Sequence, residues 1–393
     1  MIYGNSKVTI AAVKAKDGDG GCFNDEDKIA SFKHPVSGMP MAIRKLITHR
    51  QYQYHETNET NGRVPLFARA WTLQEVLLAP RVLYFESMED SFQCRNMTDC
   101  QCGMMSKDAY SKTVKRDYEM ARLGSSDSGH TLSNWASIMS QYSSRRLTVE
   151  TDRLPALSGL TKSFMKPDLG AFLAGLWQKD MHLSLTWRSV RPKQARASVY
   201  VAPSWSWAST GFEIHYKRSV DAFHMPEYHQ SHIAILDVAC EPSGLDPTGA
   251  VRSGYLRVRG RANSAQLRWD WTVRERSFIQ FGPWARVVEL DFIPQRLDPD
   301  EPFSTLAVKC LLLCSALGRS YFLVLIPGER TGFYERCGIG FGTALYRTKT
   351  YEKSGIDQPE LKINEQNYLL DGAKDYPIME WFKDVEEQEM TIV

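Results

Sequence analysis

Apolar residues recur at two different spacings along the chain, and each spacing predicts a different kind of element. Between Arg69 and Ala79 they recur every three or four positions, which predicts a short helix. Pro80 cannot donate a backbone hydrogen bond and disfavours helical geometry at the preceding residue, so this helix should end at Ala79. The apolar runs RVLYF (81–85) and KVTIAAV (7–13) predict two buried strands.

The middle of the chain changes from a polar to a helical pattern. Residues 106–130 are charged and then rich in serine and glycine, a composition typical of a flexible connector. Residues 131–210 are expected to be mainly helical, with helices near 132–143, 152–164 and 168–178. The segment APSWSWAS (202–209) should be extended, and its two tryptophans suit buried packing between domains better than a ligand-binding platform.

Beyond about residue 230 the pattern shifts toward a period of two, and residues 211–393 are expected to form a β-rich domain. Seven or eight short strands separated by Gly, Pro and Asp are typical of a small sandwich or barrel. The expected strands are HIAILDVAC, GYLRVRGRA, RSFIQFG, ARVVELDF, TLAVKCLLLCSA, SYFLVLIP, YERCGIGFG and EQEMTIV. Together with an α/β region at 1–105, a connector at 106–130 and a helical region at 131–210, this domain completes the expected organisation.

Composition narrows the classes of partner. The chain has 393 residues, of which 48 are basic and 46 acidic, for a net charge of +2. This balance gives no reason to expect nucleic acid or an anionic membrane as a partner. No apolar run reaches the roughly 18 residues needed to span a bilayer, and no signal peptide is expected. The eight cysteines are therefore expected to be reduced thiols in a cytoplasmic protein.

Two groups of metal-ligand residue types do not predict a metal site. Cys94, Cys100 and Cys102 lack the paired C-x-x-C spacing of structural zinc sites, and no nearby histidine pair completes four ligands. Ordinary thiols are favoured, and no metal is expected. The other group lies on a polar segment expected to be a solvated loop, and it consists of His224, His229 and His232.

The stretch RAWTLQE contains the candidate functional residues. Trp71, Gln74 and Glu75 share one face of the predicted helix, and Arg69 lies just upstream. Thr72 and Glu75 also fit the pattern of a capping box, in which two side chains satisfy free amides at a helix start. Glu75 is therefore either a capping or surface ion-pair residue or a functional carboxylate.

Several stretches, taken in order, resemble the fungal heterokaryon incompatibility (HET) domain family. In the first part of the chain they are MIYGNSKVTIAA, GCF, RAWTLQE, PRVLYF and QCR. Downstream they are YSSRRLTVETDRLPALSGL, FLAGLWQKDMHLSLTWR, APSWSWAS and YERCGI. Two upstream blocks of the family are missing, so residues 1–105 resemble the rear half of a HET domain, truncated at its N-terminus.

The resemblance implies both a fold and a function. It implies an incomplete TIR/flavodoxin-like α/β domain in a protein of fungal non-self recognition. Such proteins trigger programmed cell death, here through assembly with other proteins, by self-association or with an incompatibility partner. No cofactor is implied.

The resemblance leaves two alternatives open. Some related TIR domains cleave NAD+ with a glutamate in a W-x-x-x-E pattern, and Trp71 and Glu75 have this spacing. In that case Glu75 would be catalytic and would stabilise an oxocarbenium-like ribosyl cation. Arg69, Trp71 and Gln74 would bind the substrate, NAD+. The other alternative is an inactive truncated paralogue.

Overall fold

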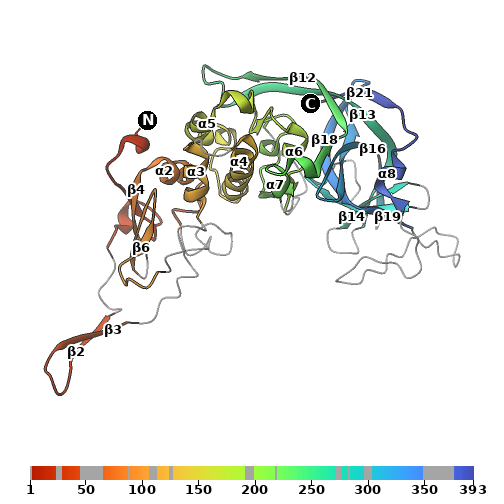
Figure 1. Cartoon of the computed structure of the whole chain (residues 1–393). Coiled ribbons are helices and arrows are strands. Elements are labelled where there is room, and N and C mark those ends of the chain that lie inside the picture. Colours follow the sequence, from red (N-terminus) through yellow and green to blue (C-terminus); the bar gives the residue numbers. More distant parts are fainter. Residues whose placement is uncertain are drawn as a thin grey trace. The chain divides into compact units, whose positions relative to one another are not determined.

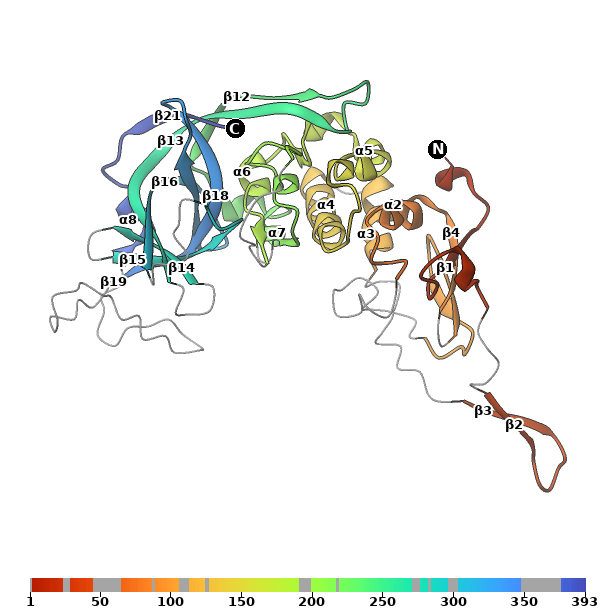
Figure 2. The same ribbon diagram turned by 180° about the vertical axis from the view of Figure 1, so that it is seen from behind.

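The computed structural model describes most of the chain (Figures 1 and 2). The described ranges are 2–23, 29–44, 65–86, 89–105, 113–123, 127–190, 199–216, 219–270, 276–281, 284–295, 303–347 and 376–393. They fall into two compact units. Unit 1 comprises Met1–Ser126, Ser137–Val149 and Ala156–Phe164, and unit 2 comprises Asp127–Ala136, Glu150–Pro155 and Met165–Val393. The expected helical region at 131–210 is thus divided between the units rather than forming a region of its own.

Unit 1 contains a mixed four-stranded sheet in the order β1-β4-β5-β6. Its strands are β1 (Thr9–Ala12), β4 (Arg81–Phe85), β5 (Asp90–Cys94) and β6 (Thr98–Cys100). β1 and β4 are parallel, and helix α2 (Trp71–Leu78) lies between them in the sequence, as in a βαβ unit. β5 and β6 extend the sheet in antiparallel fashion. The predicted helix before Pro80 is therefore confirmed, and both predicted strands are present, but the predicted burial is wrong for β1, where Ile10 is 61% exposed.

A helix lies inside the range predicted as a flexible connector, so that prediction is wrong for these residues. Helix α3 (Val114–Arg122) begins after Thr113, whose side chain accepts a hydrogen bond from the Arg116 amide. The charged composition concealed a buried stripe, because Val114, Tyr118 and Ala121 are almost completely buried at helical spacing.

Lys115 joins helix α3 to the end of helix α2. It is 1% exposed, and its Nζ donates hydrogen bonds to the carbonyls of Val76 at 2.7 Å and Ala79 at 2.5 Å. Burial lowers the pKa of Lys115 to about 8. These carbonyls are free because Pro80 ends the helix, so the lysine satisfies acceptors that α2 cannot use itself.

The remaining short elements of unit 1 are local. β2 (Ile29–Lys33) and β3 (Pro40–Arg44) form an antiparallel hairpin, and α5 (Ser158–Phe164) contacts α2 and α3. The sheet packs its inner face into a small apolar cluster. That cluster consists of Ala11, Val13, Ala79, Val82 and Tyr84, with Leu66, Phe67 and Val76 against it.

Unit 2 begins with short helices and two-residue strand pairs. The helices are α6 (Met181–Ser184), α7 (Ser219–Ala222) and α8 (Ile378–Trp381), and α4 (Ser128–Ser143) contributes residues to both units. The strand pairs are β7 (Phe172–Leu173) with β8 (Leu176–Trp177) and β9 (Arg188–Ser189) with β10 (Ile214–His215). In the described part of the chain every helix is too short or too polar to cross a bilayer.

The expected helix at 168–178 is wrong, because these residues form the β7–β8 hairpin. Its two turn residues, Ala174 and Gly175, both have positive φ, at 46° and 99°, as a tight hairpin turn requires. The Gly175 carbonyl accepts hydrogen bonds from the indoles of Trp135 at 3.0 Å and Trp207 at 3.1 Å. A side chain at 175 would come within 2.7 Å of the Trp207 indole nitrogen. Buried aromatic contacts therefore fix the turn, and the apolar spacing alone did not show them.

The tryptophans of APSWSWAS are core residues. Trp205 and Trp207 are both fully buried, and Trp207 begins a short 3-10 helix (Trp207–Ser209) instead of continuing an extended segment. The alternative of an exposed binding platform is therefore wrong. The prediction that both indoles are buried in packing is confirmed. They lie in the interior of unit 2, however, and not between two domains.

The C-terminal half of unit 2 is a closed antiparallel sheet. All eight expected strands are present, as β12 (Ile233–Pro242), β13 (Val251–Asp270), β14 (Arg276–Phe281), β15 (Trp284–Leu290), β16 (Phe303–Ala316), β17 (Arg319–Pro327), β18 (Phe333–Gly342) and β21 (Glu387–Ile392). Pairing runs β13-β14-β15-β18-β17-β16 and returns to β13, so the ring closes. Of the two predicted architectures, the barrel is the one observed.

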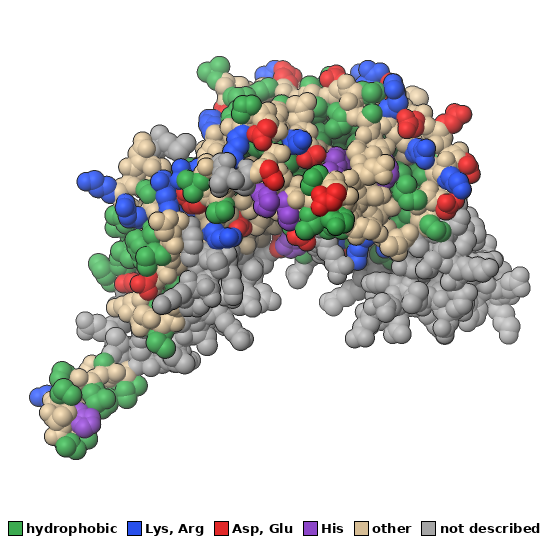
Figure 3. Space-filling model, in the orientation of Figure 1, with side chains coloured by type: hydrophobic (Ala, Val, Ile, Leu, Met, Phe, Trp, Pro, Cys, Tyr) green, Lys and Arg blue, Asp and Glu red, His purple; other side chains and the backbone are tan. Residues whose placement is uncertain are grey.

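Strand β13 takes part in two different pairings along its curved length (Figures 1 and 2). Its first part pairs with β12 and β21, and its second part pairs with β14 and β16. The additional strands are β11 (His229–Ser231), β19 (Ala344–Arg347) and β20 (Tyr376–Pro377). On the face drawn in Figure 3, basic and acidic side chains of unit 2 are interspersed, in keeping with the near-zero net charge.

Candidate functional site

Helix α2 carries the four predicted site residues on or just before its first turns. Trp71, Gln74 and Glu75 are half-buried, whereas Arg69 is exposed. The start of the helix is held by backbone bonds to a distant segment, since the Ala70 amide donates to the Arg146 carbonyl at 2.9 Å. The four residues are thus presented by a well-anchored helix end.

The predicted capping box is wrong. The residue at the cap position is Ala70, which has no side chain able to cap, and Thr72 already lies inside the helix. The Thr72 hydroxyl donates to the carbonyls of Leu66 and Arg69 and accepts a hydrogen bond from Arg145 at 3.0 Å. Thr72 therefore ties the preceding turn to the helix, and Glu75 has no capping partner there.

Gln74 makes a bond within unit 1. Its Oε1 accepts a hydrogen bond of 2.7 Å from the Gly159 amide at the start of α5. A Cβ at position 159 would lie 2.5 Å from this oxygen, so only glycine allows the approach. Since its acceptor oxygen joins α2 to α5, the structure gives Gln74 a clear packing role, and its binding role stays a prediction.

Glu75 interacts with a residue that sequence reasoning missed. Tyr3, in the short 3-10 helix η1 (Tyr3–Asn5), lies near Glu75, because η1 contacts α2. Burial raises the pKa of Tyr3, the charge of Glu75 raises it further, and the charge of Arg69 lowers it. A tyrosine, a carboxylate and a guanidinium thus share one electrostatic environment. Tyr3 lies far from Glu75 in sequence, and only its position in the resembling block MIYGNSKVTIAA could have drawn attention to it.

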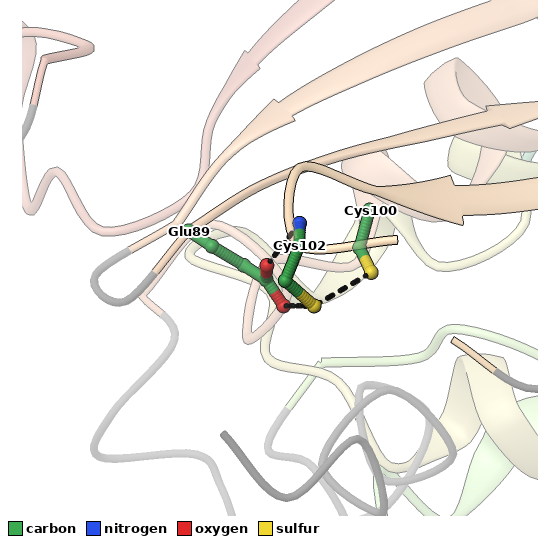
Figure 4. Close-up of side chains that lie close together, drawn as sticks. All are labelled: Glu89, Cys100 and Cys102. Atoms are coloured by element: carbon green, nitrogen blue, oxygen red, sulfur yellow. Dashed lines mark hydrogen bonds between the residues drawn. The ribbon is translucent and has the colours of Figure 1, made fainter. Parts of the chain in front are cut away.

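A second cluster forms at one end of the β5–β6 hairpin, where Glu89, Cys100 and Cys102 point toward one another (Figure 4). The two sulfur atoms are 3.2 Å apart, and Cys102 Sγ lies 3.6 Å from Glu89 Oε1. The Cys102 amide donates a hydrogen bond of 3.0 Å to Glu89 Oε2. Cys94 ends β5 (Asp90–Cys94) and does not belong to this cluster. Sequence reasoning had grouped the cysteines and had missed Glu89.

The histidines predicted to lie on a solvated loop are instead half-buried and in contact with other parts of unit 2. His229 Nδ1 lies 3.1 Å from Nε2 of His182, and Asp180 belongs to the same group. His224 stacks on His130, and His232 Nε2 lies 2.8 Å from the hydroxyl of Ser315. Burial, followed by the charge of His229, lowers the pKa of His182 to about 4. The solvated-loop prediction is wrong for these side chains.

Comparison of the chain with protein-family models, with curated proteins and with solved structures found no match. The resemblance to HET domains therefore rests on the sequence blocks themselves. The structure places two of these blocks, RAWTLQE and PRVLYF, in α2 and β4 at the centre of unit 1.

Proposed function

We propose that this chain is a HET-type protein of fungal non-self recognition that acts in the cytoplasm through protein–protein assembly and leads to cell death. The blocks that resemble the family form one connected substructure, β1–α2–β4, and Tyr3 lies near Glu75 of this substructure. Thr72 ties the turn before α2 to the helix, and Gln74 joins α2 to α5. Thr72 and Gln74 of the RAWTLQE motif therefore stabilise the fold of unit 1. This role favours a scaffold for protein assembly over a catalytic centre.

The observation that carries the proposal is the edge strand β1. Within the described ranges β1 pairs only with β4, so it is an edge strand of the four-stranded sheet. One face of the segment is apolar and open, because Val8 is 49% and Ile10 is 61% exposed, while Ala11 on the opposite face is buried. Such an edge is a template for strand addition. The partner that fits it is a second copy of this chain, paired β1 to β1.

Self-association can be tested directly with one exposed residue. Ile10→Lys places a charge on the β1 face without disturbing the core, so the fold should be retained. Light scattering should show a concentration-dependent dimer for the wild type and a monomer for Ile10→Lys. Leu245→Lys is the matched control, because Leu245 is fully exposed in unit 2 and should leave the dimer intact. Expression in a filamentous fungus should arrest growth for wild type and control only.

Two results would overturn the proposal. The first is a wild-type protein that stays monomeric at all concentrations. The second is growth arrest by Ile10→Lys equal to that of the wild type while its dimer is lost. Either result would show that growth arrest does not depend on pairing through β1.

NAD+ hydrolysis is the second candidate, favoured by the placement of Trp71, Glu75 and Arg69 on one anchored helix end. In this reaction the bond between ribose and nicotinamide breaks, water adds to the sugar, and a carboxylate stabilises the intervening cation. Purified protein incubated with NAD+ should then release nicotinamide, and Glu75→Gln should abolish the release. Glu150→Gln, which changes an exposed carboxylate, is the control. No release from the wild type would eliminate this candidate.

A further inference from the structure

We propose that Glu89, Cys100 and Cys102 form a binding site for one zinc-class divalent cation. The three side chains converge from the start of β5, the last residue of β6 and the turn that follows (Figure 4). Their ligand atoms all lie within 4.8 Å of one another. Two thiolates and one carboxylate make a soft donor set, which favours zinc or cadmium over magnesium or calcium.

The spacing of the ligand atoms is close to that of a tetrahedral site. With zinc–sulfur and zinc–oxygen bonds of about 2.3 Å and 2.1 Å, tetrahedral angles place sulfur and oxygen about 3.6 Å apart and the two sulfurs about 3.8 Å apart. Cys102 Sγ lies 3.6 Å from Glu89 Oε1, and the two sulfurs lie 3.2 Å apart. Binding thus requires the two sulfurs to separate by about half an ångström, while Cys100 Sγ and the nearest Glu89 oxygen lie within 4.8 Å of each other. The sulfur–sulfur separation also exceeds the length of a disulfide bond, about 2.05 Å, so the two sulfurs are not bonded to each other.

Backbone contacts hold the ligands in place. The Gln101 amide donates to the Asp90 carbonyl at 2.9 Å, which fixes the turn against the start of β5. Gly103, with φ of 67°, donates to the Cys100 carbonyl and turns the chain, so that the Met104 amide reaches Cys102 Sγ at 3.4 Å. An N–H directed at sulfur stabilises a thiolate. Such outer contacts orient the ligands of metal sites.

The burial and negative charge of Glu89 favour cation binding at this site. Glu89 is 1% exposed and Cys100 is 8% exposed, and the hydrogen bond from the Cys102 amide offsets only part of the cost of burying the Glu89 carboxylate. A bound cation would offset this charge and release the two thiol protons to solvent. Cys102 is only half-buried, so a water molecule can supply the fourth ligand.

The test uses the full chain, reduced and freed of metal. Titration with cadmium ion should produce ultraviolet cadmium–thiolate charge-transfer absorption that saturates at one ion per chain. Cys100→Ser and Cys102→Ser should each remove most of this absorption. Cys94→Ser is the matched control, since Cys94 is a half-buried thiol in the same sheet, and it should leave the titration unchanged. Glu89→Gln should weaken affinity by at least the roughly tenfold that outer contacts cost.

A second measurement needs no variant and so does not depend on the folding of a mutant. Zinc ion should protect Cys100 and Cys102 of the wild type from alkylation, read by mass spectrometry, while Cys22 and Cys94 react at unchanged rates. The proposal is overturned if zinc changes none of these rates, or if it protects all four cysteines equally. It is equally overturned if cadmium gives the same absorption in the wild type and in the Cys100→Ser/Cys102→Ser double variant.

Discussion

Replacing Asp291 with asparagine should destabilise unit 2 by about 3–5 kcal/mol, the usual cost of breaking a buried ion pair by changing one partner. Asp291 pairs with Arg336 of β18, whose Nε donates to Oδ2 at 2.8 Å. The two side chains are 1% and 0% exposed. An asparagine at this position would keep nearly the same shape and one acceptor oxygen, so the substitution removes mainly the negative charge.

The surroundings of Arg336 prevent its guanidinium from moving to relieve the destabilisation caused by Asp291→Asn. Its other donors reach the carbonyls of Leu185 and Trp187, each at 2.6 Å, and the guanidinium lies 3.5 Å from the centre of the Trp187 ring. These groups fix the arginine between the closed sheet and the segment that follows α6. Because the positive charge cannot turn toward water, it would remain buried without its counter-ion.

Thermal unfolding followed by tryptophan fluorescence measures this effect, because every tryptophan except Trp71 belongs to unit 2. A loss of 3–5 kcal/mol corresponds to a fall in Tm of about 6–20 °C for a domain of this size. Glu241→Gln is the control, because Glu241 forms an exposed ion pair with Arg252 and should change stability by less than about 0.5 kcal/mol. A Tm for Asp291→Asn within about 2 °C of the control, roughly the shift that 1 kcal/mol produces, would refute the reasoning.

Three further predictions concern unit stability. The lowered pKa of His182, about 4, means that the unfolded chain protonates first, so unit 2 should lose up to about 3 kcal/mol as pH falls from about 6.5 to 4. His182→Gln should flatten this pH profile, and an unchanged profile would contradict the assignment. Lys115→Met should cost unit 1 about 1–3 kcal/mol in urea unfolding by leaving the Val76 and Ala79 carbonyls without their donor, whereas Lys162→Met should cost little. Gly175→Ala should lower the Tm of unit 2, unlike Gly244→Ala in open space, and equal Tm values would contradict the close approach of Trp207.

The sequence by itself determined the elements whose patterns are local. Pro80 and the apolar spacing placed α2, the short apolar run RVLYF placed β4, and alternation placed the eight strands of the C-terminal half. Helical spacing also brought Trp71, Gln74 and Glu75 onto one helix. Each of these outcomes depends on residues within a few positions of one another, so a short window of sequence contains the necessary information.

Only the tertiary structure decided the features that join distant segments. The hairpin at Ala174 and Gly175 depends on indoles from two other segments, and α3 depends on a narrow buried stripe within a charged stretch. The proximity of Tyr3 to Glu75, the approach of Gly159 to Gln74 and the grouping of Glu89 with two thiols have no spacing that predicts them. Closure of the sheet likewise requires β13 to pair with β16, which lies about forty residues later in the sequence. Several strands have a similar alternating pattern, so the pattern does not identify this partner, and only the packing of the strands determines it.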